Sequence, residues 1–312
     1  PIAYSIGISG SVTLLLSVMP GPAFTTFAQR MATALDSFAL LAIPFFILAG
    51  QLMNQGGIAI RLIDFAKVLV GRLPGGLAFV NVIANMLFGA ISGSAAASAS
   101  AIGSIMTPKM NEEGYDTAYS TAVNITSATT GLVIPPSNIL IVYSLASGGV
   151  SIAALFLAGY IPGILTGLVL MAVAGVFAYK NNYPVGETVN FKTGVIKFLD
   201  AIPSLFLLII VIGGIIAGYF TATEASAIAV LYTLILSFIY KQIKFNHLPA
   251  ILLRTVGTTA IVLFLVGTSM GLSWVMSYAN IPQSVSAGLL SLSSNPFTIL
   301  LIINFILLFV CI

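Results

Sequence analysis

The segment Ser92-Gly93-Ser94 is the first place where the residue types suggest chemistry, and it lies in a tract of small residues from Gly89 to Ser104. A turn here leaves peptide carbonyls and serine hydroxyls without helical partners. Lipid tolerates such backbone only where protein buries it or where it lines a wet cavity. The carbonyls at a hairpin tip can bind a hard cation, while helix N-termini face an anion. The alternative reading is close helix packing, which small residues favour.

A second unusual segment ends in two consecutive prolines. Residues 117–134 are dense in hydroxyl side chains, and Pro135-Pro136 follows directly. Each proline removes a backbone donor and disfavours helical conformation in the preceding residue, so the helix must break here. The carbonyls of about residues 131–134 then lose their helical partners. A purely structural kink is the alternative reading.

The two breaks share a polar character without any ionisable side chain. A proton relay inside a membrane would be expected to use a carboxylate. Two neutral, polar breaks instead suggest a sodium site made of carbonyl and hydroxyl oxygens. The only acid inside an apolar span is Glu224, which could be an ion ligand. We expect it to form a capping box with Thr221 instead.

The composition places these breaks in a membrane. Of 312 residues, 59% are hydrophobic and only 6% are charged, whereas soluble domains carry about 25% charged residues. The net charge of +3 is small and scattered, which argues against nucleic acid as a partner. The single Cys311 and the single His247 exclude a disulfide framework and a transition-metal site built from Cys and His.

The elements that must position the two breaks are membrane helices, each of roughly 20 apolar residues. The expected spans are 2–19, 38–53, 152–179, 201–219, 224–240 and 256–278, with a last apolar run at 297–312. We interpret 75–110 as a re-entrant hairpin and 117–147 as one broken crossing. Of the 11 Lys and Arg residues, all but Arg30 then fall on one side, which should be cytoplasmic.

Weak internal similarity predicts an inverted repeat, a frequent plan among secondary transporters. Residues 43–50 are similar to 262–267, and 71–74 to 293–296. We therefore expect one membrane domain, 1–312, with a first repeat at about 38–147. Connecting or scaffold helices would occupy about 152–245, and a second repeat would start at about 250–312. A second hairpin would follow Ile312, so we expect a fragment.

Several motifs in order resemble the large membrane subunit (M, DctM-like) of tripartite ATP-independent periplasmic (TRAP) transporters. The resemblance covers essentially the whole chain, apart from the family's extreme N-terminus and C-terminal part. The motifs are Leu41-Ala-Ile-Pro-Phe-Phe-Ile-Leu-Ala-Gly50, Gly56-Gly57-Ile58 with Arg61-Leu62, Val70-Gly71 with Leu73-Pro74-Gly75-Gly76, Ser92-Gly93-Ser94, Ile134-Pro-Pro-Ser137 and Thr221–Ala225.

The resemblance implies a sodium-driven importer of organic acids in a bacterial inner membrane, moving by an elevator mechanism. Its partners would be a small membrane subunit and a periplasmic substrate-binding protein. The sequence motifs are most similar to those of family members that handle sialic acid or related sugar acids. Transporters of C4-dicarboxylates form the other large class. Sodium would be the coupling ion, without any other cofactor.

The resemblance also assigns residues to sites. Carried over by motif, one sodium site consists of Ser92, Gly93, Ser94, Gly131, Ile134 and Pro136. The substrate would lie near Ser94, Ser137 and Asn138. The family's second sodium site and part of its substrate site belong to the second repeat.

Three other classes of membrane protein are alternatives to this reading: a stand-alone symporter, a passive channel and an intramembrane protease. A self-sufficient sodium/anion symporter could share the hairpin architecture, and a passive channel is not distinguished by sequence. An intramembrane serine protease would need a histidine within a span to activate Ser94, yet His247 lies in a loop. An aspartyl protease would need two Asp residues in spans. The candidates Asp36, Asp64, Asp116 and Asp200 all flank them.

Overall fold

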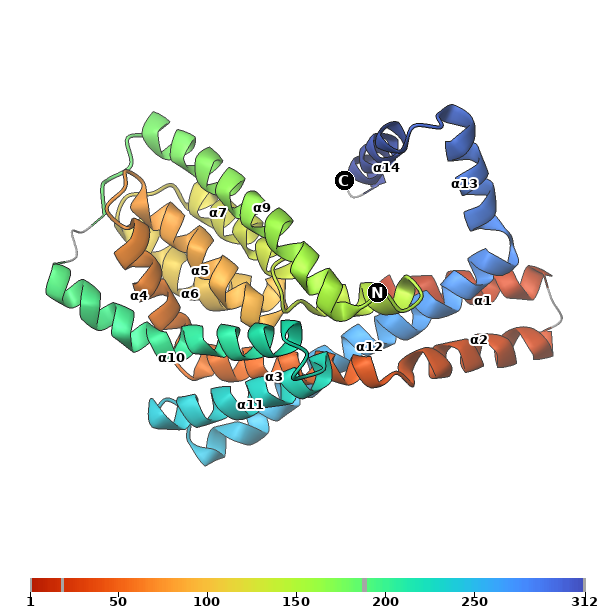
Figure 1. The fold of residues 1–312 in the computed structure, drawn as a ribbon, viewed down its shortest axis with the longest axis horizontal. Coiled ribbons are helices and arrows are strands. Elements are labelled where there is room, and N and C mark those ends of the chain that lie inside the picture. The colour runs from red at the N-terminus through yellow and green to blue at the C-terminus, as the bar shows by residue number, and fades with distance from the viewer. Residues whose placement is uncertain (1, 18–19, 187–189, 311–312) are drawn as a thin grey trace. The chain divides into compact units, whose positions relative to one another are not determined.

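The computed structural model describes residues 2–17, 20–186 and 190–310, so Cys311 lies outside the described residues. Within these ranges the chain forms fourteen α-helices and three short 3-10 helices (Figure 1). Five segments are long and apolar enough to cross a membrane: Phe38–Gln55, Ile152–Lys180, Lys192–Ile216, Ala222–Ile239 and Phe245–Tyr278. The prediction of an all-α membrane protein is therefore confirmed.

The chain divides into two compact units, of which the first comprises residues 1–36 and 261–312. It contains α1 (Ile2–Ser17), α2 (Pro20–Leu35), the end of α12 (Leu248–Tyr278), α13 (Ile281–Leu292) and α14 (Pro296–Val310). A small core of Leu14, Ala23, Phe27 and Val275 holds the first helices together. The expected spans 2–19 and 297–312 correspond to α1 and α14, which have 16 and 15 residues.

The second unit comprises residues 37–260 and carries both breaks. Its elements are η1 (Phe38–Leu41), α3 (Ala42–Gln55), α4 (Ile58–Val70), α5 (Gly76–Ser92), α6 (Ala95–Glu112), α7 (Thr117–Ala128), η2 (Thr129–Leu132), α8 (Asn138–Ala146), α9 (Ile152–Lys180), α10 (Phe191–Ile216), α11 (Ala222–Ile239), η3 (Phe245–His247) and the start of α12.

The helical hairpin expected at 75–110 is the pair α5 and α6. The chain turns at Gly93, whose φ of +61° is accessible to glycine at little cost, and Ser94 is extended. Thirteen of the 17 residues of α5 are buried, against six of the 29 residues of α9. Helix α5 therefore lies in the interior of its unit with α9 packed against it, whereas only six of the 18 residues of α6 are buried.

The helix break expected at Pro135-Pro136 is also present. Helix α7 ends at Ala128, continues as η2 to Leu132, and α8 begins only at Asn138. Helix α5 packs on α6, α7 and η2, while α9 contacts α5, η2 and α8. The hairpin tip and the break are therefore neighbours in one layer of packed helices.

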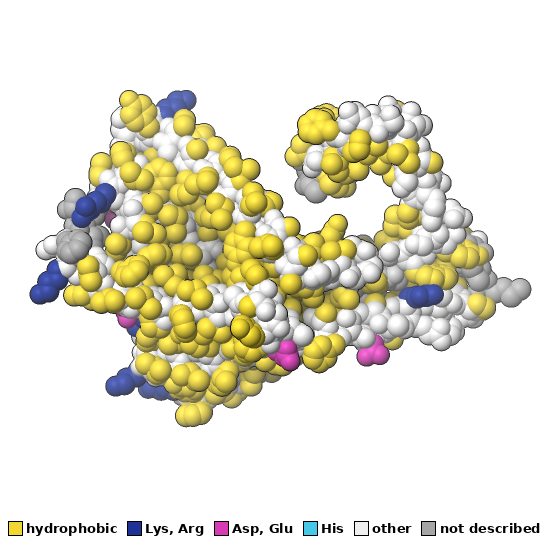
Figure 2. Space-filling model, in the orientation of Figure 1, with side chains coloured by type: hydrophobic (Ala, Val, Ile, Leu, Met, Phe, Trp, Pro, Cys, Tyr) yellow, Lys and Arg dark blue, Asp and Glu magenta, His cyan; other side chains and the backbone are white. Residues whose placement is uncertain are grey.

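Charged side chains gather at one end of the second unit. Arg61 and Asp64 on α4 pair with Asp200 and Lys197 on α10, at 3.1 and 3.0 Å respectively. Figure 2 shows hydrophobic side chains across the visible face of this unit, and Lys and Arg at the end where α9 stops and α10 starts. A surface with this distribution suits a hydrocarbon layer with a basic border.

Glu224 has the capping role that we expected. Its carboxylate Oε2 accepts from the backbone N–H of Thr221 at 2.8 Å. The hydroxyl oxygen of Thr221 in turn accepts from the N–H of Glu224 at 3.3 Å. This capping box satisfies amides at the start of α11 that have no helical partner.

Candidate cation and substrate site

The two serines of the hairpin tip have different surroundings. The hydroxyl oxygen of Ser94 accepts from the N–H of Ala97 at 3.3 Å and so caps α6. Ser92, the last residue of α5, is 1% exposed. Its hydroxyl has no hydrogen-bond partner among the described residues. One serine therefore has a structural task at the turn, and the other has none.

The break leaves backbone oxygens free because prolines occupy the donor positions. In an α-helix the carbonyl of Gly131 would accept from residue 135, and that of Leu132 from residue 136. Both residues are prolines, which lack an N–H. The hydroxyl of Ser137 donates to the carbonyl of Leu132 instead. The Gly131 carbonyl has no such substitute among the described residues.

Close backbone approaches bring the tip against the break. A Cβ built on Gly93 would lie 3.1 Å from the backbone nitrogen of Asn138 and 3.2 Å from its side-chain amide. A Cβ on Gly89 would collide with the Cα of Gly131. From the other side, a Cβ on Gly50 of α3 would lie 2.8 Å from the Cβ of Ser92. The glycines thus allow three helices to meet at the tip.

The remaining predicted site residues line the same junction. The side chain of Ile134 faces Gly163 on α9, where a Cβ would collide with it. Pro136 lies with Phe46 and Ile91 around a small apolar space. The structure therefore brings together Ser92, Gly93, Ser94, Gly131, Ile134, Pro136, Ser137 and Asn138 within one junction.

Two buried polar atoms at this junction lack partners. The Oγ of Ser92 and the Oδ1 of Asn138 are both buried, and neither has a hydrogen-bond partner among the described residues. Leaving such an atom unsatisfied costs about 1–3 kcal/mol, so native proteins rarely do so without reason. Ser92 precedes Gly93 in the turn and Asn138 packs against Gly93, so a ligand at the tip could satisfy both.

Helix ends of both polarities converge here. The C-terminal ends of α5 and η2 carry partial negative charge, and the N-terminal ends of α6 and α8 carry partial positive charge. The side chain of Ser137 points to Leu132 and does not cap α8. The junction can therefore hold a cation through neutral oxygens and a carboxylate through amides. None of the eight residues is ionisable, so it offers no acid–base catalysis.

Sequence reasoning missed a buried polar cluster beneath the tip. It consists of Asn81, Asn85, Ser98, Asn124 and Ser127, all at most 6% exposed. Asn81 and Asn85 are one turn apart in an apolar helix, and that spacing was the available signal. The partners come from α6 and α7, so only the fold shows that the five side chains meet.

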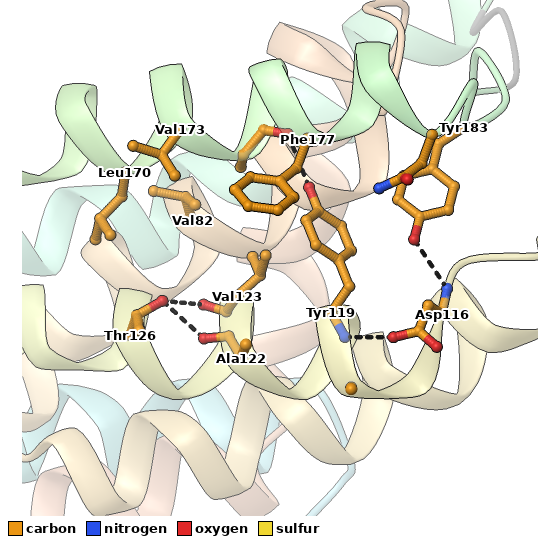
Figure 3. Close-up of a pocket in the computed structure, with 13 residues that line it drawn as sticks. Val82, Asp116, Tyr119, Ala122, Val123, Thr126, Leu170, Val173, Phe177 and Tyr183 are labelled. Carbon is orange, nitrogen blue, oxygen red and sulfur yellow. Dashed lines mark hydrogen bonds between the residues drawn. The ribbon is translucent and has the colours of Figure 1, made fainter.

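A cavity of about 620 Å³ lies away from the junction, between α5, α7 and α9 (Figure 3). Several of its polar lining groups are hydrogen-bonded within the protein. The hydroxyl of Tyr119 donates to the carbonyl of Ala174 at 2.9 Å, and the Asp116 N–H donates to the hydroxyl of Tyr183 at 3.3 Å. The walls are largely apolar, with Asp116 and Asn181 among the few polar residues that line the cavity. The junction, with its unpaired oxygens, is the better candidate site.

Comparison with known proteins gives a consistent result. A family model described as the DctM component of the tripartite ATP-independent periplasmic transporter matches residues 1–312. The chain is 57% identical over 310 residues to protein YgiK of Salmonella typhimurium, covering 99% of this chain and 71% of YgiK. It is 37% identical over 305 residues to the C4-dicarboxylate TRAP transporter large permease DctM of Pseudomonas aeruginosa, covering 97% and 71%.

A further relative is the sialic acid TRAP transporter large permease SiaM of Vibrio cholerae. It is 37% identical over 310 residues, which cover 99% of this chain and 72% of SiaM. The motifs that first indicated the family fall on structural features: 41–50 on α3, 71–76 at the start of the hairpin, and 134–137 on the break. The chain is thus a transport protein, not an enzyme. It belongs to the DctM family, the large permease component of tripartite ATP-independent periplasmic transporters.

Proposed function

We propose that this chain is the membrane subunit of a sodium-coupled importer of an organic acid in a bacterial inner membrane. A periplasmic binding protein would deliver the substrate, and a small membrane subunit would complete the scaffold. The junction would move with its helices relative to that scaffold, as in an elevator. Sodium would be the coupling ion, with no organic cofactor. The alternative function is that of a stand-alone sodium/anion symporter, which would need no binding protein.

One observation carries the proposal: the paired unsatisfied oxygens at the hairpin tip. Ser92 Oγ and Asn138 Oδ1 are buried without partners among the described residues, and the proline at position 135 denies the Gly131 carbonyl its helical donor. A set of neutral oxygens suits a hard monovalent cation, whereas a proton has no base to bind there. We assign the cation to Ser92, Ser94 and the carbonyls of Gly93, Gly131, Ile134 and Pro136.

The substrate is proposed to be a carboxylate held by helix N-termini. The first amides of α8 lie beside Gly93, and Ser94 begins α6 close by. No side chain caps α8, and free amides at a helix start favour an anion. The names of two relatives give a C4-dicarboxylate and sialic acid, both of which are carboxylic acids. We therefore propose one of these two classes, bound near Ser94, Ser137 and Asn138.

Uptake into proteoliposomes tests the proposal. The full-length protein is reconstituted with its small subunit, and uptake of labelled sialic acid and succinate is measured with and without sodium and binding protein. A requirement for both would support the proposal. Uptake with sodium alone would instead indicate a stand-alone symporter. Sodium-independent uptake would contradict the cation site, and failure of counterflow would indicate a passive channel.

A further inference from the structure

A cluster of five buried polar side chains joins α5, α6 and α7 beneath the junction. We call it the amide cluster: Asn81, Asn85, Ser98, Asn124 and Ser127. Four of the five are 0% exposed, and Asn124 is 6% exposed. Burying amides away from water is unfavourable unless they are hydrogen-bonded, so their arrangement calls for a reason.

Asn85 is the centre of the amide cluster. Its Nδ2 lies 2.6 Å from Asn81 Oδ1, 3.0 Å from Ser127 Oγ and 3.2 Å from Asn124 Oδ1. Its Oδ1 accepts from the hydroxyl of Ser98 at 2.6 Å. A single side chain of α5 is therefore bonded to α6 and to α7 at the same time.

Asn124 provides a second connection between the same helices. Its Nδ2 donates to the backbone carbonyl of Ala99 on α6 at 2.9 Å. Gly103 makes room for it, because a Cβ at that position would lie 3.0 Å from the Cγ of Asn124. The bonds of the cluster thus fix α6 against α7 as well as against α5.

The amide cluster lies one to two helical turns from the segments that would hold the cation. Ser98 follows Ser94 by four residues, and Ser127 precedes Gly131 by four residues. Each interval is about one helical turn, or roughly 6 Å. Asn85 lies about two turns before Ser92 on α5. The three helix ends at the junction are therefore tied together just beneath it.

Buried hydrogen bonds of this kind are needed more for positioning the ligands of a cation than for holding the three helices together. Apolar side chains of similar size would hold three helices together without desolvating amides. Ion ligands, in contrast, must be placed within a few tenths of an ångström, and residues behind the ligands supply that precision. A fully satisfied polar network makes one arrangement of the helices rigid and unique.

We propose that Asn85 is a positioning residue of the cation site: through Ser98 and Ser127 it sets the relative positions of the hairpin tip and the break. It does not touch the ion. This inference rests on the sodium-coupled function proposed above, and it concerns residues that carry none of the proposed ligands.

Binding of radioactive sodium to the purified full-length protein tests the inference. Asn85→Leu keeps a similar volume and removes the amide, and Ser98→Ala removes only the hydroxyl that Asn85 accepts from. We expect each to raise the sodium concentration for half-saturation by about 10-fold or more, the usual effect of losing a residue that orients ion ligands. The double variant should be little worse than Asn85→Leu, because both changes break one network.

A matched control is Asn111→Leu on α6, because the Asn111 side chain is exposed on the same hairpin and lies outside the amide cluster. It should bind sodium like the wild type. A second readout is the rise in unfolding temperature on adding sodium. A merely structural role for Asn85 would lower the sodium-free midpoint but leave this rise unchanged, whereas a positioning role reduces the rise itself.

The outcomes separate this inference from the proposed function. If wild-type protein binds no sodium, the sodium-coupled function is wrong and the role of Asn85 falls with it. If the wild type binds sodium and folded Asn85→Leu and Ser98→Ala bind it equally well, only the positioning role is wrong. Should Asn85→Leu fail to fold, Ser98→Ala alone decides, because it removes a single oxygen atom.

Discussion

Ser92 and Ser94 flank the same glycine, but only Ser94 has a structural partner. Ser94 caps α6 through Ala97, and Ser92 is buried without a partner among the described residues. Losing a serine cap costs about 1 kcal/mol. Removing an unsatisfied buried hydroxyl, in contrast, is nearly neutral or stabilising. The two serines can therefore be told apart by experiment.

We expect Ser92→Ala to raise the half-saturating sodium concentration for uptake without lowering the unfolding temperature in sodium-free buffer. Ser94→Ala should weaken sodium activation and also lower the unfolding temperature by a few degrees. Both quantities are measured on the same purified preparations. Unchanged sodium activation in both variants would contradict the assignment of the cation to the hairpin tip.

Lys67 on α4 carries a charge that the fold disfavours. Burial, reinforced by the ammonium of Lys109 and by Lys197, lowers the pKa of Lys67 to about 8, against the attraction of Asp64. The ordinary pKa of a lysine side chain is 10.5. Between these pH values the unfolded chain binds a proton that the folded protein does not, so stability rises with pH there. Below pH 8 the buried charge lowers stability.

Lys67→Met should therefore raise the unfolding temperature at pH 7, and the gain should shrink as the pH approaches 10. Thermal unfolding in detergent at several pH values measures this. Lys197→Met is the contrasting variant, because its ammonium lies 3.0 Å from the carboxylate of Asp64. It should leave stability unchanged or slightly lower. A loss of stability in Lys67→Met at pH 7 would show that attraction by Asp64 outweighs burial.

At the residue scale, sequence alone predicted the backbone chemistry better than the side-chain chemistry. Ser92, Ser94 and the two prolines were found because the loss of a donor or the presence of a hydroxyl is a local property. The unpaired Oδ1 of Asn138 and the central place of Asn85 were not found. Both depend on which side chains three separate helices bring together, and no local pattern encodes that.

At the element scale, α9 lies close to the break because glycines line one of its faces. Gly159, Gly163 and Gly167 are spaced by four residues. A Cβ at Gly159 would lie 2.6 Å from the carbonyl oxygen of Val133, and one at Gly163 would collide with Ile134. The missing side chains let α9 approach the backbone of the break directly, which helps to hold the break in place.

Gly163→Ala should consequently destabilise the protein, although alanine is the better helix former by about 1 kcal/mol. Overpacking against Ile134 costs about 1–3 kcal/mol, which outweighs that gain. The matched control is Gly257→Ala on α12, where a Cβ meets nothing within 4 Å. It should keep or raise the unfolding temperature. Equal tolerance of both changes would mean that α9 is free to move away from the break.

The sequence-based prediction shortened α10 and did not identify α4 as a helix. The first carries charged residues near its start, and the second is both charged and short. The expected span 201–219 begins in the structure at Phe191, because Lys197 and Asp200 of α10 are paired with α4. Helix α4 itself has 13 residues and three charged side chains, so it does not resemble a span. A run of apolar residues identifies a helix that faces lipid. It does not identify a helix whose charged side chains are paired within the protein.

At the scale of the whole molecule, the basic residues predict how the chain is oriented. Helix α9 has 29 residues, about 43 Å at 1.5 Å per residue, which is enough to cross the hydrocarbon core. It ends at Lys180, and Val150 lies before its other end. By the distribution of Lys and Arg, the Lys180 end should be cytoplasmic.

Labelling of single cysteines tests this orientation. In a background from which Cys311 and any other native cysteine are removed, a membrane-impermeant maleimide should label Val150→Cys in intact spheroplasts. Lys180→Cys should react only after permeabilisation. Val150 is 44% exposed, and Lys180 is also exposed, so access to the reagent is limited by the membrane. The opposite pattern would reverse the orientation and the side from which the junction is loaded.

The absence of ionisable groups from the eight junction residues has an electrical consequence. Neutral oxygens stabilise a cation without cancelling its charge, so each sodium ion would cross the membrane with its full charge. A potential of 100 mV acts on one such charge with about 2.3 kcal/mol. The transport current should then report the net charge moved in each cycle. Uptake of one sodium ion with one monoanionic substrate would move no net charge, and each additional sodium ion would make uptake depend on voltage.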